Sequence, residues 1–231
     1  MTKQLAHTIL ISDIHLGSPL SRINLLRQIL KSWTFSKLII VGDLFASNDF
    51  QKLSSDEWQF LKMLSNYVGK GIEIIWIEGN HDIGPVENLR HLLGIQIYQK
   101  YCWHWHDKKC LAIHGHQFDK LIGTKFSNFI SWIYLKLLQN TFICNNLGQL
   151  LAHIGNNWQR ITYDVRLGCI NLANELDAEF VFAGHTHQSE KIITNDITYI
   201  NTGCWVEKNC TLVVLCADDP NPVVYEYQLE L

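Results

Sequence analysis

Short polar motifs at the ends of apolar runs constrain the fold of this 231-residue chain more than any other feature. Five apolar runs are expected to form buried strands, at residues 7–12, 37–41, 73–77, 110–113 and 179–183. A polar motif follows each run, in the order Asp13-Ile14-His15, Gly42-Asp43, Gly79-Asn80-His81-Asp82, His114-Gly115-His116 and Gly184-His185-Thr186-His187. Because strand ends on one edge of a sheet can bring distant residues together, the motifs predict a single shared site.

The composition predicts a globular protein, with 47% hydrophobic residues, 18% charged residues and a net charge of -3. A nuclease is disfavoured, because a partner held by bulk electrostatics would require a clear basic excess. We expect no secretory signal in the first residues and no transmembrane segment, because no apolar stretch approaches the about 20 residues that span a bilayer. The seven cysteines include no close CxxC pair, which favours reduced thiols in a cytoplasmic protein over a zinc–thiolate site.

The first half of the chain alternates strands with helices, which indicates a parallel sheet covered by helices. The apolar spacing predicts helices at residues 20–33, 55–68 and 85–93, the second capped by Ser54 or Ser55. Strand-like segments at residues 196–201, 210–216 and 223–229 are closely spaced, so antiparallel pairing is expected there. We expect a single domain over residues 1–231, with a helical insertion at about 120–176 whose second helix spans residues 157–175.

The residue types in the motifs favour a metal site. Asp13 and His15 alternate along an extended chain, so both side chains would point to the same side. Carboxylate oxygen with imidazole nitrogen suits Mn, Fe or Zn better than Ca or Mg. Asp43 follows Gly42, which permits a tight turn, and its two carboxylate oxygens suit a bridge between two metals. Each motif alone is as well explained by a turn or a core histidine, but together they form a specific pattern.

In this order the motifs resemble those of the calcineurin-like metallophosphoesterases: D-x-H, G-D, G-N-H-[DE], a later histidine and G-H-x-H. The resemblance extends from Asp13 to about Gly203. It implies an α/β protein, an α/β/β/α sandwich with a helical insertion, and a dinuclear metal site at the carboxyl ends of the strands. It also implies one set of ligands for each metal, with Asp43 as the bridge: Asp13, His15 and His187 for one, and Asn80, His114 and His185 for the other.

The implied function is metal-dependent hydrolysis of a phosphodiester, phosphomonoester or pyrophosphate, with Mn as the first choice of metal and Fe or Zn as alternatives. Two metals about 3.5–4 Å apart share a water and lower its pKa, so that a bridging hydroxide attacks phosphorus. The metals also neutralise charge on the phosphate oxygens. His81 is left to stabilise the transition state or protonate the leaving group, and Asp82 either orients His81 or caps the next helix.

A closer resemblance is to the branch containing UDP-diacylglucosamine pyrophosphohydrolases and their uncharacterised bacterial relatives. It is carried by residues 11–18, by the insertion and by Gly203-Cys204-Trp205-Val206. Those enzymes typically carry Arg in place of His81 and Asp in place of His116, so the substrate stays open between lipid-linked and nucleotide-linked phosphoesters. The apolar face of residues 126–138 is expected to be a core or dimer contact, with a lid at the membrane interface as the alternative.

Three further polar residues follow the expected ligand His114: His116, Gln117 and Asp119. They are candidates to contact substrate or to hold the His114 ring in position as second-layer contacts. The structural alternative is a polar loop. His104 and His106 alternate as in a strand, which favours an edge strand or hairpin over a stray metal site with Asp107. The alternative function is a non-catalytic scaffold of the same fold that binds protein partners. Such a protein would be expected to lose metal ligands, and every expected ligand is present here.

Overall fold

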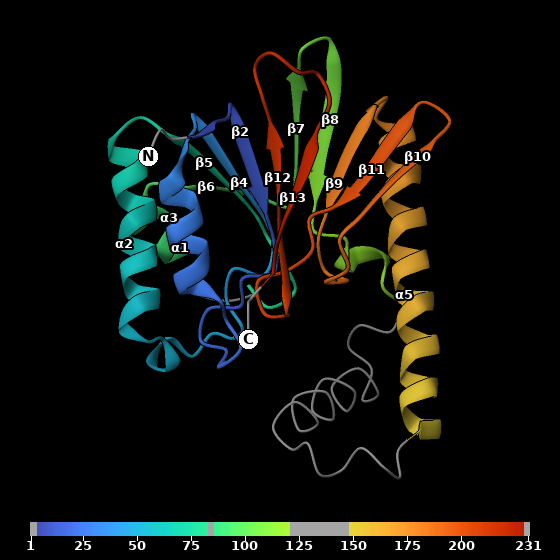
Figure 1. Ribbon diagram of the computed structural model, residues 1–231, viewed down its shortest axis with the longest axis horizontal. Helices are drawn as coiled ribbons and strands as arrows, with labels where there is room; N and C mark the ends of the chain where they lie inside the picture. Colours follow the sequence, from blue (N-terminus) through green and yellow to red (C-terminus); the bar gives the residue numbers. More distant parts are fainter. Residues whose placement is uncertain (1–3, 83–85, 121–147, 229–231) are drawn as a thin grey trace.

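The computed structural model describes residues 4–82, 86–120 and 148–228. Within these residues two sheets pack face to face, and helices cover the outer face of each sheet (Figure 1). The predicted α/β/β/α sandwich is therefore confirmed.

In the described part of the chain, the larger sheet has six strands in the order β13-β12-β2-β4-β5-β6. Their bounds are β13 (Val223–Gln228), β12 (Asn209–Leu215), β2 (Thr8–Ile11), β4 (Lys37–Val41), β5 (Glu73–Ile77) and β6 (Gln96–Tyr98). Strands β2, β4, β5 and β6 are parallel, whereas β12 runs antiparallel to β2. The central strands are covered on both faces, which explains why their sequences are continuous apolar runs. A short ribbon, β1 (Gln4–Leu5) with β3 (Trp33–Thr34), lies beside this sheet.

The second sheet has five strands in the described residues, in the order β10-β11-β9-β8-β7. Their bounds are β10 (Glu190–Thr194), β11 (Ile197–Asn201), β9 (Phe180–Ala183), β8 (Lys108–Ile113) and β7 (Lys100–Trp105). The predicted hairpin is confirmed, since β7 and β8 pair antiparallel, with exposed His104 on β7 and His106 in the turn. The expected antiparallel pairing in the last third is confirmed for β12 with β13 and for β11 with β10. On its other side β11 pairs parallel to β9, which was not expected.

Helices α1 (Ile23–Ser32), α2 (Ser55–Gly69) and α3 (Val86–Leu93) cover the six-stranded sheet. Ser54 caps α2: its hydroxyl accepts a hydrogen bond from the Glu57 backbone N–H at 3.3 Å, and the Glu57 carboxylate accepts one from the Ser54 N–H at 2.7 Å. This capping box satisfies two backbone donors at the start of the helix, so Ser54 rather than Ser55 is the N-cap.

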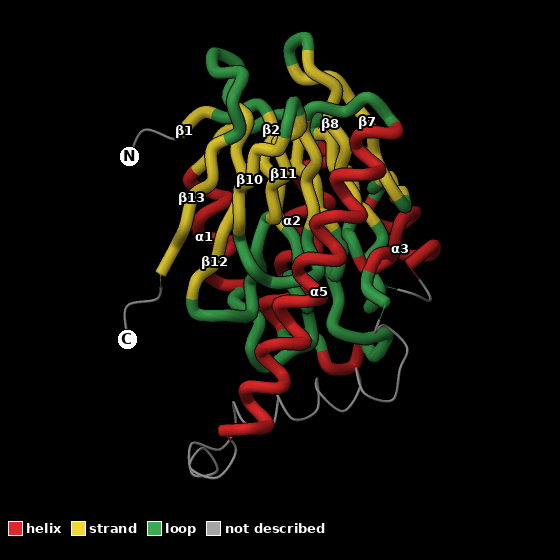
Figure 2. Tube along the Cα trace, turned by 90° about the vertical axis from the view of Figure 1, so that its right-hand side faces the viewer, coloured by secondary structure: helices red, strands yellow, loops and turns green. Residues whose placement is uncertain are grey.

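Helix α5 (Gly148–Glu175) covers the five-stranded sheet and lies in front of it in Figure 2. Ile161, Val165, Cys169 and Ala173 pack against a buried cluster that includes Leu111 and Val181. The later part of the predicted insertion is therefore an outer layer of the sandwich. The apolar face proposed as a core contact or lid, residues 126–138, lies outside the described residues. None of the described helices combines the length and apolarity needed to cross a membrane.

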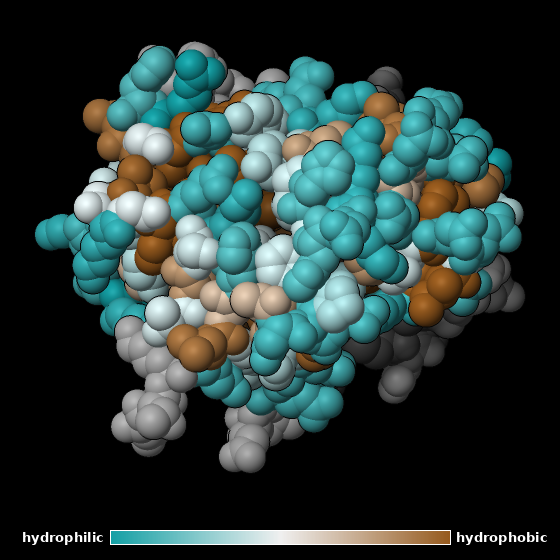
Figure 3. All heavy atoms as spheres, turned by 90° about the horizontal axis from the view of Figure 1, so that it is seen from above, coloured by the Kyte–Doolittle hydropathy of each residue, from teal (hydrophilic) through white to brown (hydrophobic). Residues whose placement is uncertain are grey.

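The core between the sheets joins Ile39, Val41 and Ile75 from one sheet to Phe180 and Phe182 from the other. Because β2, β4, β5, β8 and β9 all end at the same edge, the loops that follow them meet at the lower end of the sandwich in Figure 1. Seen from above, the opposite end carries mostly hydrophilic residues with hydrophobic patches between them (Figure 3).

Candidate metal centre

The loops that follow the strands turn sharply at the candidate ligands. Asp13, His15, Asp43, His185 and His187 all have positive φ angles, from 49° to 69°. The backbone after β2 is therefore left-handed, and the expectation that Asp13 and His15 lie on an extended chain is wrong. Neighbouring loops hold this geometry: Asp13 N–H donates to the Gly42 carbonyl at 3.1 Å, and His15 N–H donates to the Asp43 carbonyl at 3.0 Å.

One group of ligand atoms comes from Asp13, His15 and His187. Nε2 of His187 lies 3.4 Å from Oδ1 of Asp13 and 3.2 Å from Nε2 of His15. The other oxygen of Asp13 accepts a hydrogen bond from the His185 backbone N–H at 3.0 Å. Asp13 therefore uses one oxygen to hold the backbone of the last motif and presents the other to the histidines.

A second group comes from Asp43, His114 and His185, with Asn80 beside them. Nε2 of His114 lies 3.4 Å from Oδ2 of Asp43 and 3.3 Å from Oδ1 of Asn80. The same Asp43 Oδ2 lies 3.8 Å from Nε2 of His15, so one carboxylate oxygen faces both groups. The other oxygen of Asp43 accepts from the His81 backbone N–H at 2.9 Å. All seven predicted ligands are thus brought together, and Asp43 lies at their centre.

Three of the candidate imidazoles have a second ring nitrogen in contact with a carbonyl or carboxylate oxygen. Nδ1 of His114 lies 2.8 Å from the Val41 carbonyl; since a carbonyl only accepts, Nδ1 carries the proton and Nε2 faces Asp43. Nε2 of His185 lies 3.0 Å from a carboxylate oxygen of Asp119, which leaves Nδ1 for the site. Nδ1 of His187 lies 3.7 Å from Glu207. Such contacts fix the orientation of metal-binding histidines.

The carboxylates and imidazoles of this cluster shift one another's pKa values. Burial lowers the pKa of His114, but the carboxylates of Asp43 and Asp13 and the Val41 carbonyl together outweigh burial and raise that pKa to about 9. Burial lowers the pKa of His15 to about 4, against the opposing effect of Asp43. Burial also disfavours the charged form of Asp43, yet the charge of His114 holds the pKa of Asp43 well below its usual range. The buried carboxylates and imidazoles thus stabilise each other's charges.

The residues present fit divalent metal ions. Oδ1 of Asp13 is buried and accepts no hydrogen bond from the described residues, although two imidazole nitrogens lie close to it. A carboxylate oxygen left in this way, facing clustered ring nitrogens, is satisfied by a cation coordinated to all of them. Mixed oxygen and nitrogen donors favour a transition metal or zinc over calcium or magnesium.

His81 lies over the site on its exposed side, with 46% of its side chain accessible. Nδ1 contacts the Ala46 carbonyl at 3.1 Å, and because the carbonyl only accepts, Nδ1 is the donor. Nε2 is then the unprotonated nitrogen of the neutral ring, 4.0 Å from Oδ2 of Asp43. His81 also lies close enough to His15 and Asp43 to be a further ligand.

The carboxylate of Asp82 contacts groups other than the His81 ring. Its buried carboxylate accepts hydrogen bonds from the backbone N–H groups of Phe45 and Gly79, at 3.1 and 3.0 Å, and from Nε1 of Trp76 at 3.1 Å. These contacts join the loop after β4 to the loop after β5. The carboxylate does not orient the His81 ring, whose Nδ1 contacts the Ala46 carbonyl instead. The alternative that Asp82 caps α3 involves residues 83–85, which lie outside the described residues.

Of the three predicted substrate residues, Asp119 contacts His185, whereas His116 and Gln117 line a cavity beside the centre. All three lie in or next to a short 3-10 helix, η2 (His116–Phe118). Four functional candidates were missed: Glu207 and Cys204 beside His187, and Glu78 and Gln99 in the cavity wall. The sequence signal for the first two was the Gly203–Val206 segment, which contains Cys204 and directly precedes Glu207, while Glu78 and Gln99 belong to no motif.

Comparison with known proteins agrees with this geometry. The family model described as calcineurin-like phosphoesterase matches residues 6–189, which is most of the chain and includes all seven ligand candidates. No curated protein gives a match.

Solved structures of similar fold include an archaeal phosphodiesterase, with 16% identity, a TM-score of 0.53 and coverage of 95% of this chain and 99% of that chain. Another is a predicted phosphoesterase from Streptococcus pneumoniae, with 17% identity, a TM-score of 0.43 and coverage of 97% and 98%. A third is zinc-bound Vps29 from Entamoeba histolytica, with 15% identity, a TM-score of 0.48 and coverage of 96% and 91%. At these identities the archaeal protein supports the fold alone.

Proposed function

The chain belongs to the calcineurin-like phosphoesterase family, and we propose that it hydrolyses phosphoesters with two divalent metal ions held around Asp43. The observation that carries this proposal is that two ligand groups meet at one carboxylate oxygen. Oδ2 of Asp43 lies 3.8 Å from Nε2 of His15 and 3.4 Å from Nε2 of His114. A single ion would need only one of the two groups.

The ligands divide between the two ions as the sequence resemblance implies, with Asp43 common to both. Asp13, His15 and His187 would hold one ion, and Asn80, His114 and His185 the other. The donor set suits Mn best, with Fe or Zn as alternatives. When bound, the ions would lower the pKa of a water molecule and neutralise charge on the phosphate oxygens.

His81 is the residue proposed to act on the substrate directly. The contact of Nδ1 with the Ala46 carbonyl fixes the ring, and Nε2 is left on the open side of the centre. In the imidazolium form, which carries a proton on Nε2 as well, the ring could donate that proton to the leaving oxygen or stabilise the charge that develops on phosphate. The alternative role as a metal ligand predicts a different result in the experiment below.

A scaffold without catalysis is the competing function, and the backbone of the site argues against it. Left-handed conformations of non-glycine residues cost roughly 1–3 kcal/mol each, and five ligand candidates adopt them. A protein that only binds partners through its surface gains nothing from that strain. The substrate class proposed is a phosphodiester, phosphomonoester or pyrophosphate, lipid-linked or nucleotide-linked.

The proposal is tested by following hydrolysis of bis-(p-nitrophenyl) phosphate by metal-free protein before and after addition of Mn, Fe or Zn. We expect no activity without metal and activity with at least one of these ions. Absence of activity in every divalent metal, with circular dichroism showing an intact fold, would overturn the proposal in favour of a scaffold.

Two variants separate the roles of metal ligand and proton donor. Asp43→Asn is expected to lose both metal ions and activity, because both groups share this carboxylate. His81→Ala is expected to keep its metal and to lose activity by about 10²–10⁴-fold, as for removal of a general acid. His104→Ala, at an exposed position on β7, is the control and should behave as wild type. Loss of metal from His81→Ala would show that His81 is a ligand.

A further inference from the structure

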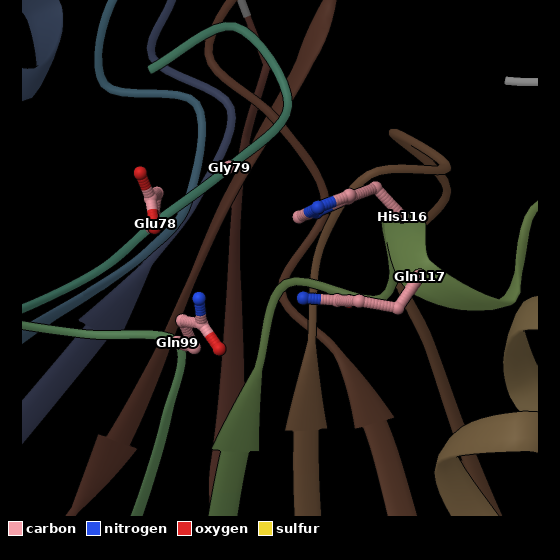
Figure 4. Close-up of a pocket in the computed structure, with 5 residues that line it drawn as sticks. All are labelled: Glu78, Gly79, Gln99, His116 and Gln117. Carbon is pink, nitrogen blue, oxygen red and sulfur yellow. The ribbon is translucent and has the colours of Figure 1, made fainter. Parts of the chain in front are cut away.

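A cavity of about 300 Å³ opens beside the metal centre, lined by Glu78, Gly79, Gln99, His116 and Gln117. Figure 4 shows that His116 and Gln117 extend from η2 toward the wall formed by the other three residues. That wall is held together because the Glu78 backbone N–H donates to the Tyr98 carbonyl at 2.8 Å, next to Gln99. The cavity is therefore built by loops of both sheets.

The cavity adjoins the reaction centre on two sides. Gly79 precedes the candidate ligand Asn80, and a Cβ at Gly79 would lie 2.2 Å from Oδ1 of Asp43. The ring of His116 lies 5.4 Å from the ring of His114, measured between centroids. A phosphoester bound at the metal centre could therefore place one of its ester groups in this cavity.

The side chains in the cavity wall are hydrogen-bonding groups. Gln117 accepts a hydrogen bond from the Gly115 N–H through Oε1, so its amide NH₂ remains to face the cavity, as Figure 4 shows. Nδ1 of His116 is buried and has no hydrogen-bond partner among the described residues. Gln99 offers both a donor and an acceptor, and the Glu78 carboxylate offers acceptors. A hydroxyl-bearing group, which both donates and accepts, matches this set.

The same residues disfavour two other ligand classes. No Lys or Arg from the described residues lines the cavity, and the Glu78 carboxylate would repel a second phosphate. An acyl chain would bury amide and carboxylate groups without partners, which is unfavourable. The volume is also at the lower end of the roughly 300–1,000 Å³ found for small-molecule pockets, so it suits one small group.

We infer that this cavity binds the uncharged, hydroxyl-bearing alcohol esterified to the phosphate, of the sugar or polyol class. The inference rests on the proposed function, which places the phosphate at the adjacent metal centre. Glu78, Gln99 and Gln117 are then specificity-determining residues. They select a polyol phosphoester over an alkyl phosphoester of the same length.

The test is isothermal titration calorimetry of the Mn-loaded protein with glycerol 1-phosphate and with propyl phosphate, which lacks the two hydroxyls. We expect glycerol 1-phosphate to bind about tenfold more tightly, because leaving polar groups unpaired costs a comparable factor. Gln99→Ala and Glu78→Gln are expected to bring the ratio close to one. The matched controls Asn174→Ala and Glu175→Gln, exposed at the far end of α5, should keep it.

Metal content and hydrolysis of bis-(p-nitrophenyl) phosphate are measured on the same samples. Three results would overturn the inference: wild type binds the two ligands equally, wild type binds neither, or the preference for glycerol 1-phosphate persists in both Gln99→Ala and Gln117→Ala. A clear preference without hydrolysis in any metal would instead overturn the proposed function and leave the cavity as a polyol-binding site. Hydrolysis without a preference would overturn the cavity inference alone.

Discussion

The residue types of the candidate ligands could be predicted from the sequence, whereas their backbone conformations could not. The motifs identified Asp13, His15 and Asp43 because their residue types and order match a metal site. Their left-handed conformations were not predicted, since hydrogen bonds between distant loops hold them, such as that from Asp13 to Gly42. Asp and His adopt left-handed backbone conformations more readily than β-branched residues do, but the sequence alone does not indicate that these residues adopt them.

Close approach at Gly79 gives a prediction at the residue scale. A Cβ at this position would lie 2.2 Å from Oδ1 and 2.3 Å from the backbone nitrogen of Asp43, so one of these atoms must move. Gly79→Ala is expected to lower the free energy of unfolding by about 1–3 kcal/mol, as overpacking does, and to reduce metal content. Thermal unfolding and metal analysis provide the two measurements.

Gly69→Ala is the matched control, because a Cβ at the last residue of α2 meets no atom within 4 Å. This variant should keep its metal and be as stable as wild type or slightly more stable. If Gly79→Ala bound metal and unfolded like Gly69→Ala, the close contact between the β5 loop and Asp43 would not exist in solution.

At the scale of elements, Asp82 joins the loops that follow β4 and β5. Its carboxylate accepts from the N–H groups of Phe45 and Gly79 and from the indole of Trp76. An asparagine has one acceptor oxygen and would turn an NH₂ group toward some of these donors. Asp82→Asn is therefore expected to lower the free energy of unfolding by about 1–3 kcal/mol and to weaken metal binding.

Urea unfolding and metal titration of Asp82→Asn check this prediction. Asp107→Asn, in the exposed turn between β7 and β8, is the control and should match wild type in both measurements. A catalytic role for Asp82 predicts the opposite pattern, with normal stability and metal affinity but slow turnover.

The sequence predicted some elements well and others poorly. Strands β4 and β5 have the predicted bounds, because short buried apolar runs between turn residues give a clear signal. Strand β10 was missed, since most of Glu190–Thr194 is exposed at a sheet edge and carries no apolar run. The parallel pairing of β11 with β9 was not predicted either, since β10 separates these two strands along the chain.

At the scale of the whole molecule, the metal centre depends on the packing of the two sheets. Asp13, Asp43 and Asn80 follow strands of the six-stranded sheet, whereas His114 and His185 follow strands of the five-stranded sheet. The family resemblance made this assembly predictable, because it implied both the sandwich and the ligand set. The cavity was not predictable, since Glu78 and Gln99 become neighbours only when β5 and β6 pair.

The central claim is that two ions, joined by Asp43, form the reaction centre. The most direct measurement is titration of the metal-free protein with Mn, with bound metal and hydrolysis of bis-(p-nitrophenyl) phosphate followed together. We predict that activity rises until two ions are bound per chain and then stays constant. Full activity with one ion per chain, or two bound ions without any hydrolysis, would contradict the claim.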